Sequence, residues 1–401
     1  MEGGIGKAGG GTARPGWREG LRGMFLFQVA NSFAEQFGWN FLFLYAARSG
    51  LDYNGIALYF LAEFGSCILF IPLARRLDIL KAMRWGLVLR IAAFALVLHV
   101  AWAGQFYIAG ILLGAFVTLF WIPYNTRYLE LTSDANRAQA SAALFSLFAV
   151  LGAVLPVLSG TVIALWGFRP VILVSIAVLA GGLAFSFRLP PAGIMVVDLR
   201  ATLPCCRRLL PLLACEGLWQ GVFWLGVPLG LILRNASSEG YGAFYTMLGL
   251  LGGVASLVAG RWSDRQKSRG PLVVGAALSG GAFSLAAALF RADPAAWTLS
   301  MGMVYFSTYI LFPFTFTVVG ERSPDPATAM TVRELVTSIG RVLGGLIVVL
   351  SIRLTGGLPL ALGAGGLALV GLAGSYMMTR RKGAGRRAQG ARPDRRRAKL
   401  A

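Results

Sequence analysis

The sequence predicts an all-α membrane protein that crosses the bilayer twelve times, in two pseudo-symmetric bundles of six helices. Hydrophobic residues make up 56% of the chain and charged residues only 13%, whereas an average soluble domain has about 25% charged residues. The apolar residues form long runs, and a helix of about 20 such residues spans the lipid core. Basic residues gather in alternate links between these runs. These three observations together predict the fold class.

Twelve apolar runs can be assigned in order along the chain. They cover approximately residues 22–47, 53–75, 81–101, 104–128, 138–164, 168–187, 209–233, 240–262, 271–290, 296–319, 329–352 and 357–379. With this division, thirty Lys and Arg residues lie in the termini and the links on one side, and five lie in the opposite links. Because basic residues are retained in the cytoplasm, we expect both termini there and the protein in a plasma membrane, the bacterial inner membrane.

The longest internal link divides the chain into two halves. It covers residues 188–208 and contains three prolines and scattered charges, which is typical of a linker. The basic tail of ten Lys and Arg residues is interpreted as a solvated cytoplasmic segment in preference to a lipid-binding one. The predicted units are a cytoplasmic tail (1–20), an N-terminal half (21–187), a cytoplasmic linker (188–208), a C-terminal half (209–379) and a basic cytoplasmic tail (380–401).

Weak similarity between the halves supports the predicted pseudo-symmetry. The segment Glu35–Asn40 of the first run is similar to Glu216–Gln220 of the seventh, and Pro123 of the fourth run has a counterpart in Pro313 of the tenth. The two offsets along the chain nearly agree. Internal repeats of this kind are typical of transporters built from two related halves.

The first run carries a carboxylate near its middle. On a helix, Asn31, Glu35 and Trp39 share one face with Gln28 and Ser32. A charged carboxylate at the centre of the bilayer costs about 2.5–3.5 kcal/mol on insertion scales. We therefore expect this face to line a wet cavity or to meet a partner charge.

Further charges lie inside later runs. Glu63 belongs to the second run and Arg90 to the third, and a static pair of Arg90 with Glu63 or Glu35 is as plausible as a functional role. In the eleventh run, Glu334 and Arg341 share a face with Thr337 and Ser338, and Arg333 precedes them. For Arg341 we favour an anion-binding or coupling role over the alternative, a structural ion pair between helices.

Aromatic and amide side chains accumulate in the seventh and tenth runs. The members are Trp219, Gln220 and Trp224, then Tyr305, Thr308 and Tyr309. They fit a wall that contacts a ligand, and they fit equally the aromatic belts found at membrane interfaces.

One link carries a motif that resembles the major facilitator superfamily. Residues Gly260–Arg269 match the Gly-x-x-x-Asp-Arg-x-x-Arg/Lys signature of that family, with Asp264 and Arg265 at its centre. The resemblance implies the twelve-helix fold of that superfamily and identifies no subfamily. It also implies that Asp264 latches a cytoplasmic gate, with Arg127 or Arg137 as a partner, and that Asp78 marks a degraded copy of the motif. We place Arg333 and Glu334 with this gating set.

The predicted function is secondary active transport of a small organic solute by alternating access, coupled to protons, with export favoured over import. Glu35 or Glu63 would take up the proton, and the loss of negative charge would free Arg90 or Arg341. The expected partners are the solute, protons and membrane lipids, and we expect no nucleic acid, a monomer, no enzymatic activity, no metal and no cofactor. The alternatives are a lipid-moving protein of the same fold and a membrane sensor or scaffold that transports nothing.

Overall fold

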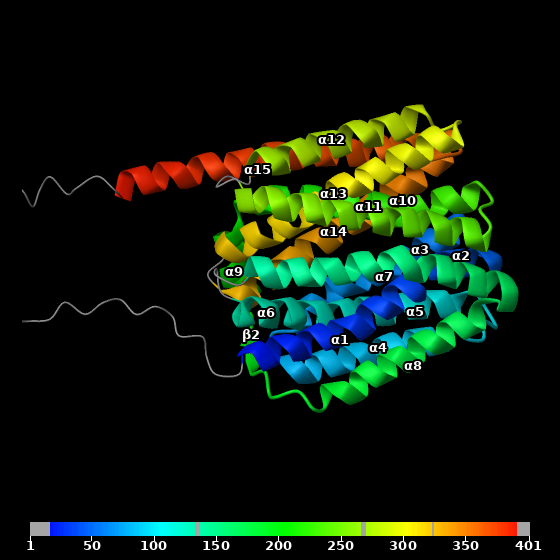
Figure 1. Ribbon diagram of the computed structural model, residues 1–401, viewed down its shortest axis with the longest axis horizontal. Coiled ribbons are helices and arrows are strands. Elements are labelled where there is room, and N and C mark those ends of the chain that lie inside the picture. Colours follow the sequence, from blue (N-terminus) through cyan, green and yellow to red (C-terminus); the bar gives the residue numbers. More distant parts are fainter. Residues whose placement is uncertain (1–16, 133–136, 266–269, 323–324, 391–401) are drawn as a thin grey trace, which may run out of the picture.

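Long helices run side by side along the whole molecule in the computed structural model, which describes residues 17–132, 137–265, 270–322 and 325–390 (Figure 1). The first half contains α1 (Trp17–Phe37), η1 (Trp39–Phe41), α2 (Leu42–Arg48), α3 (Tyr53–Phe70), η2 (Ile71–Leu73), β1 (Arg76–Asp78), α4 (Ile79–Leu96), α5 (Gly104–Phe116), η3 (Val117–Trp121), α6 (Ile122–Leu131), α7 (Arg137–Trp166) and α8 (Phe168–Ser186). Then follow β2 (Ile194–Val196), α9 (Leu199–Cys206), α10 (Leu210–Leu233), α11 (Ser238–Arg265), α12 (Gly270–Leu289), α13 (Pro294–Arg322), α14 (Pro326–Thr355) and α15 (Pro359–Gly390).

These helices confirm the predicted all-α membrane fold of twelve spanning units. In the described part, ten of the units are long enough and apolar enough to cross a membrane, judged by their length and composition. The other two are α1 with its continuation in α2, and α4. They fall short because they carry polar and charged residues, among them Glu35 in α1 and Arg90 in α4. Polar and charged groups at this depth need a polar cavity or a partner of opposite charge.

The helices form two groups, which we call the N-terminal bundle (α1–α8) and the C-terminal bundle (α10–α15). α1 begins and α15 ends at the same end of the molecule, at the left of Figure 1. We call this end the terminal end and the other the opposite end. The residue boundaries of the predicted domains remain a prediction.

The link between the bundles has structure that the sequence did not predict. β2 lies within it and pairs antiparallel with β1, so that Leu77 is opposite Met195 in the register. The backbone N–H of Val197 also donates to the carbonyl of Arg75, at 2.9 Å. The first part of the link is therefore fixed to the N-terminal bundle at the terminal end.

The first spanning unit breaks near its middle, after Phe37. A short turn, η1, joins α1 to α2, and Trp39 in this turn lines the cavity described below. A broken helix within a membrane needs new partners for its free backbone groups. Ser159 of α7 donates to the carbonyl of Phe37 at 2.5 Å, and the Tyr241 hydroxyl of α11 donates to the carbonyl of Asn40 at 3.0 Å. Both neighbouring helices therefore stabilise the break.

Glycines allow the closest helix contacts. In the C-terminal bundle, a Cβ on Gly221 of α10 would lie 2.3 Å from the carbonyl oxygen of Arg341 in α14. Between the bundles, a Cβ on Gly249 of α11 would lie 2.3 Å from the carbonyl oxygen of Gly152 in α7. Small residues at such crossings let helices pack backbone to backbone in lipid. The first crossing places Arg341 against α10, and the second joins the two bundles.

Candidate functional site

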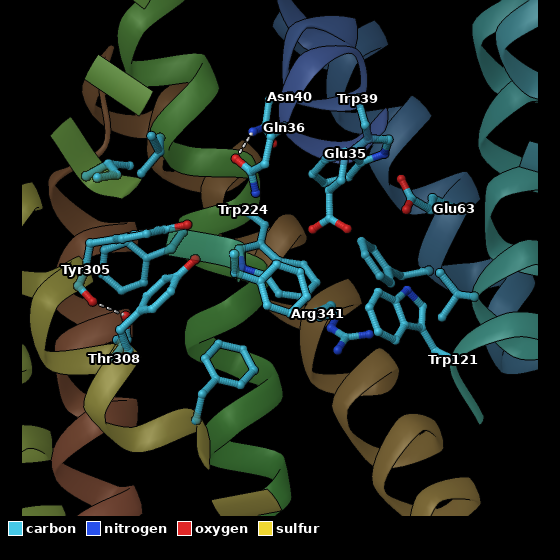
Figure 2. A pocket seen from close by; sticks show the side chains of 18 of the residues that line it. Glu35, Gln36, Trp39, Asn40, Glu63, Trp121, Trp224, Tyr305, Thr308 and Arg341 are labelled. Carbon is cyan, nitrogen blue, oxygen red and sulfur yellow. Dashed lines mark hydrogen bonds between the residues drawn. The ribbon is translucent and has the colours of Figure 1, made fainter. Parts of the chain in front are cut away.

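A cavity of about 320 Å³ lies between the two bundles. Its wall comes from α1, α3, α4, α5 and α6 on one side and from α10, α11, α13 and α14 on the other. Figure 2 shows the carboxylate of Glu35 directed into the space between Trp224, Tyr305 and Glu63. This volume is at the lower end of the range typical of sites for small organic ligands.

The N-terminal bundle contributes two carboxylates and one guanidinium group. Arg90, only 2% exposed, donates to the side chain of Asn31 and lies 4.7 Å from the centre of the Phe116 ring. Glu63 is 3% exposed, and its Oε2 has no hydrogen-bond partner among the described residues. Glu35 makes no hydrogen bond or ion pair with any described residue, although Arg90 is near enough to act on it electrostatically.

The C-terminal bundle holds two buried ion pairs. Arg341 pairs with Glu334, two turns earlier on the same face of α14, and its Nε donates to Oε1 of Gln220 at 2.8 Å. Arg333 pairs with Glu216 of α10, which is 1% exposed. Both guanidinium groups therefore have a carboxylate of their own. The ion pair of Arg341 lies within α14, whereas the alternative named for it was an ion pair between helices.

Aromatic rings surround these charges. The Arg341 guanidinium lies 4.6 Å from the centre of the Trp224 ring and 4.9 Å from that of Phe64. On the wall formed by α13, the rings of Tyr305 and Tyr309 are 4.8 Å apart. Flat aromatic walls of this kind bind organic molecules and also attract cations.

The charges at the cavity do not balance. The lining contains Glu35, Glu63 and Glu334 against Arg90, Arg333 and Arg341, and Glu216 lies behind Arg333. Among the described residues there are thus four carboxylates for three guanidinium groups. The C-terminal bundle is neutral, so the excess negative charge belongs to the N-terminal bundle.

The bundles also touch each other at the cavity wall and beyond it. Toward the opposite end, Arg353 of α14 donates to the side chain of Asn54 in α3, with Nη2 at 2.9 Å. Toward the terminal end, the rings of Tyr128 in α6 and Phe316 in α13 are 6.3 Å apart. The cavity therefore lies near the middle of the molecule, with contacts between the bundles toward each end.

Most of the predicted binding residues line this cavity, and two lie just behind it. The lining includes Glu35, Trp39, Glu63, Arg90, Trp219, Tyr305, Tyr309 and Arg341. Asn31 and Gln220 are fully buried. Asn31 accepts a hydrogen bond from Arg90, and Gln220 accepts one from Arg341. Their predicted role in binding a solute or coupling its transport remains a prediction.

The predicted gating residues are more scattered. Arg333 and Glu334 line the cavity. Arg127 is partly exposed and pairs with Glu130 at 3.0 Å, and Asp78 accepts the N–H of Lys81 at the start of α4, at 2.9 Å. The side chains of Arg137, Asp264 and Arg265 lie outside the described residues, so the latch implied by the family resemblance stays a prediction.

Among the described residues, Arg90 forms no ion pair with Glu63 or Glu35, and its Nη1 donates to the side chain of Asn31. Glu216 is the buried partner of Arg333. The sequence reasoning missed Trp121, which enters the cavity wall at a π-helical turn, η3. The Trp-Ile-Pro segment at residues 121–123 was the available signal, since π-turns are frequent at functional sites.

Comparisons with known proteins show the fold alone. No protein-family model and no curated protein sequence matches the chain. The chain is similar in structure to the human organic anion transporter MFSD10 (TETRAN), at a TM-score of 0.70 and 14% identity over 90% of this chain and 100% of that one. A POT family transporter in complex with a thioalcohol-conjugated peptide gives a TM-score of 0.69 at 12% identity, over 91% and 96%.

A third solved structure, the fucose:proton symporter FucP of E. coli, has a TM-score of 0.60 and 14% identity over 92% of this chain and 99% of that one. All three likenesses cover nearly the whole of both chains, so they concern the complete arrangement of helices. The resemblance seen at Gly260–Arg269 is confirmed at this level. The chain has the fold of the major facilitator superfamily of transporters, and no subfamily is indicated.

Proposed function

We propose that this protein is a secondary active transporter that moves a small organic solute by alternating access and couples the movement to protons. The cavity between the bundles is the proposed solute site, since transporters of this architecture bind solute near the middle of the membrane. The solved structures that share the fold are those of transporters, which supports the class of function.

The observation that carries the proposed proton coupling is the excess carboxylate. In a site with four carboxylates and three guanidinium groups, one proton makes the set neutral. Glu35 is our candidate for this proton, because it contacts the cavity and lacks a partner among the described residues. A change of charge at one site shifts a conformational equilibrium when the two states hold that charge with different free energies. Protonation of Glu35 would therefore bias the inward-open and outward-open states.

We propose export as the direction, across a plasma membrane, with both termini in the cytoplasm. The aromatic wall formed by Trp224, Tyr305 and Tyr309 suits an amphipathic solute, and an exporter can draw such molecules from the cytoplasm or inner leaflet. The basic links lie at the terminal end, including Arg75 and Arg76 beside β1. Their position supports a cytoplasmic terminal end.

The test is proton flux in liposomes that contain the purified protein and a pH-sensitive dye. Aromatic amines, carboxylic acids and sugars are added one class at a time, and a transported solute should change the internal pH. Glu35→Gln should abolish this solute-dependent flux. The matched control is Glu239→Gln, which changes an exposed glutamate at the start of α11 and should leave the flux unchanged.

Two results would remove the proposal. One is the absence of solute-dependent proton flux for every class, and the other is an unchanged flux in Glu35→Gln. The scaffold alternative is tested in the same assay by deletion of residues 380–401. A transporter should keep its flux without this tail, whereas a scaffold has no flux to lose.

A further inference from the structure

Each arginine at the cavity already has a hydrogen-bond or ion-pair partner within its own bundle. Arg333 and Arg341 each have a buried carboxylate, and Arg90 has the amide of Asn31. Two further donors among the described residues, Nε of Arg90 and Nε of Arg333, are buried without a hydrogen-bond partner. Because Arg333 and Arg341 are already neutralised by buried carboxylates, an anionic solute beside either guanidinium group would add a negative charge that nothing balances.

The carboxylates that the N-terminal bundle contributes to the cavity, Glu35 and Glu63, form no ion pair with any described residue. Glu35 is partly accessible, lines the cavity and has no partner among the described residues. Glu63 adds negative charge beside it, with one oxygen that no described group satisfies. Trp39 and Phe116, which also line the wall there, bring no neutralising charge. The charge that this part of the site lacks is therefore a positive one, which a cation would supply.

An aromatic wall lies within electrostatic reach of Glu35. Tyr305 and Tyr309 of α13 both interact with its charge, and the centres of their rings are 4.8 Å apart, with the ring planes tilted by 36°. Trp224 stands below the carboxylate in Figure 2. The faces of such rings attract organic cations, most strongly where water is excluded.

On the basis of the proposed transport function, we propose that the solute is a small organic cation with an apolar ring, held by Glu35 as its counter-ion and by the rings of Tyr305 and Tyr309. The same carboxylate binds either the cation or a proton. Binding of the cation to the protonated site releases one proton to solvent, and the total charge of the site is the same in both states. With one cation exchanged for one proton, protons that move down their gradient can drive export of the cation.

The groups that face Glu35 support this exchange. They are Glu63 from α3, Arg90 from α4, and Tyr305 and Tyr309 from α13. The described side chains of α7, from residue 147 onward, include no ionisable group. Arg90 is the one described cation that acts on both carboxylates, and Arg341, which already pairs with Glu334, acts on Glu63 as well. A bound cation therefore adds the charge that Arg90 alone does not supply.

The experiment is equilibrium binding to the purified full-length protein, followed by tryptophan fluorescence. The probes are benzyltrimethylammonium, benzylsulfonate and benzyl alcohol, which share a ring and differ in charge. At mildly alkaline pH the ammonium compound should bind about tenfold or more tightly than the sulfonate. Glu35→Gln should weaken binding of the ammonium compound by about tenfold or more and leave benzyl alcohol unaffected. Glu239→Gln, at an exposed site, is the control and should bind all three probes as the wild type does.

The pH dependence separates a direct role of Glu35 from a merely structural one. The quaternary ammonium probe is a cation at every pH, so any change in its affinity reports on the protein. Its affinity should fall toward acid pH in the wild type and in Glu35→Asp, which keeps the charge, and should stay constant in folded Glu35→Gln. Preference for the sulfonate, equal affinity in Glu35→Gln, or no saturable binding of the ammonium probe at millimolar concentration would each overturn the proposal. If proton flux with another solute persists in that event, only the assigned solute class is wrong and transport stands.

Discussion

At the scale of single residues, Arg341 shows how this protein keeps a charge inside a membrane. Its guanidinium group donates to Glu334 and Gln220 and lies against the rings of Trp224 and Phe64. Transfer of an isolated charge to such a place costs several kcal/mol, and only a full set of partners offsets that cost. The same side chain also joins α14 to α10, since Gln220 belongs to α10. Arg341 is therefore first of all a support for the C-terminal wall of the cavity.

This arrangement predicts that the two partners depend on each other. Arg341→Met leaves Glu334 buried without its cation and should lower the free energy of unfolding by about 3–5 kcal/mol. Arg341→Met with Glu334→Gln removes both charges and should recover a large part of that loss. Thermal unfolding of the purified variants in detergent measures the difference. Arg291→Met, at an exposed loop position, is the control, and equal losses in the single and double variants would contradict the pairing.

The residues also show where sequence reasoning stopped. Helical spacing put Glu35 and Trp39 on one face, and that face does line the cavity. Asn31, on the same face, instead points to Arg90, which the spacing of one helix cannot indicate. Glu216 is the counterpart of Glu35 in the second half, but it is neutralised by Arg333. Pairing of this kind depends on how closely α10 approaches α14, and the sequence of either helix alone does not contain that distance.

At the scale of elements, the long helices were predictable and the short ones were not. The apolar run 168–187 became α8 (Phe168–Ser186), because bilayer thickness and residue type fix the length of a spanning helix. The strand β2, only three residues long, forms through a partner in a distant segment, and no local pattern precedes it. The π-turn η3 likewise lies in an unbroken apolar run. Its place depends on the packing of α5 and α6 against neighbouring helices.

Helix starts outside the membrane have their own chemistry, and Asp52 gives a prediction that depends on pH. It caps α3: its carboxylate accepts from Nδ2 of Asn54 at 2.9 Å and from the N–H of Gly55 at 2.8 Å, and these bonds lower the pKa of Asp52. A lowered pKa means that the stabilisation is present above the unfolded-state pKa and is lost as the pH falls through the folded-state value. Asp52→Ala should therefore cost about 1 kcal/mol near neutral pH.

At strongly acid pH the difference between Asp52→Ala and the wild type should shrink, because a protonated Asp52 is a weaker acceptor for the helix N-terminus. Unfolding of both proteins, followed across the acid range, measures this. Asp293→Ala serves as the comparison, since Asp293 accepts the N–H of Ala295 at the start of α13 in the same way, at 2.9 Å. A difference for Asp52→Ala that stays constant down to the lowest pH would show that the carboxylate charge has no part in the cap.

At the scale of the whole molecule, alternating access requires the contacts between the bundles to open and close. Between α7 and α11 they are close and specific: Gly249 packs on Gly152, and the N–H of Val157 donates to the Thr246 hydroxyl at 3.0 Å. Val157 follows Pro156, whose ring interrupts the hydrogen bonding of α7, so this bond to α11 satisfies a backbone group near a weak point of the helix.

A link across this contact should therefore stop transport. In a variant whose native cysteines are replaced by serine, Val157→Cys with Thr246→Cys places one thiol on each bundle, and a short bis-methanethiosulfonate reagent can join them. The joined protein should lose solute-dependent proton flux in liposomes, because the bundles can no longer separate there, and a reducing agent should restore it. Arg84→Cys with Ser186→Cys is the control, since the two native side chains hydrogen-bond at 3.1 Å within the N-terminal bundle and a link there leaves the bundles free to move. Full flux in the joined Val157 and Thr246 variant, or equal loss in the control, would show that transport does not depend on opening at the contact of α7 with α11.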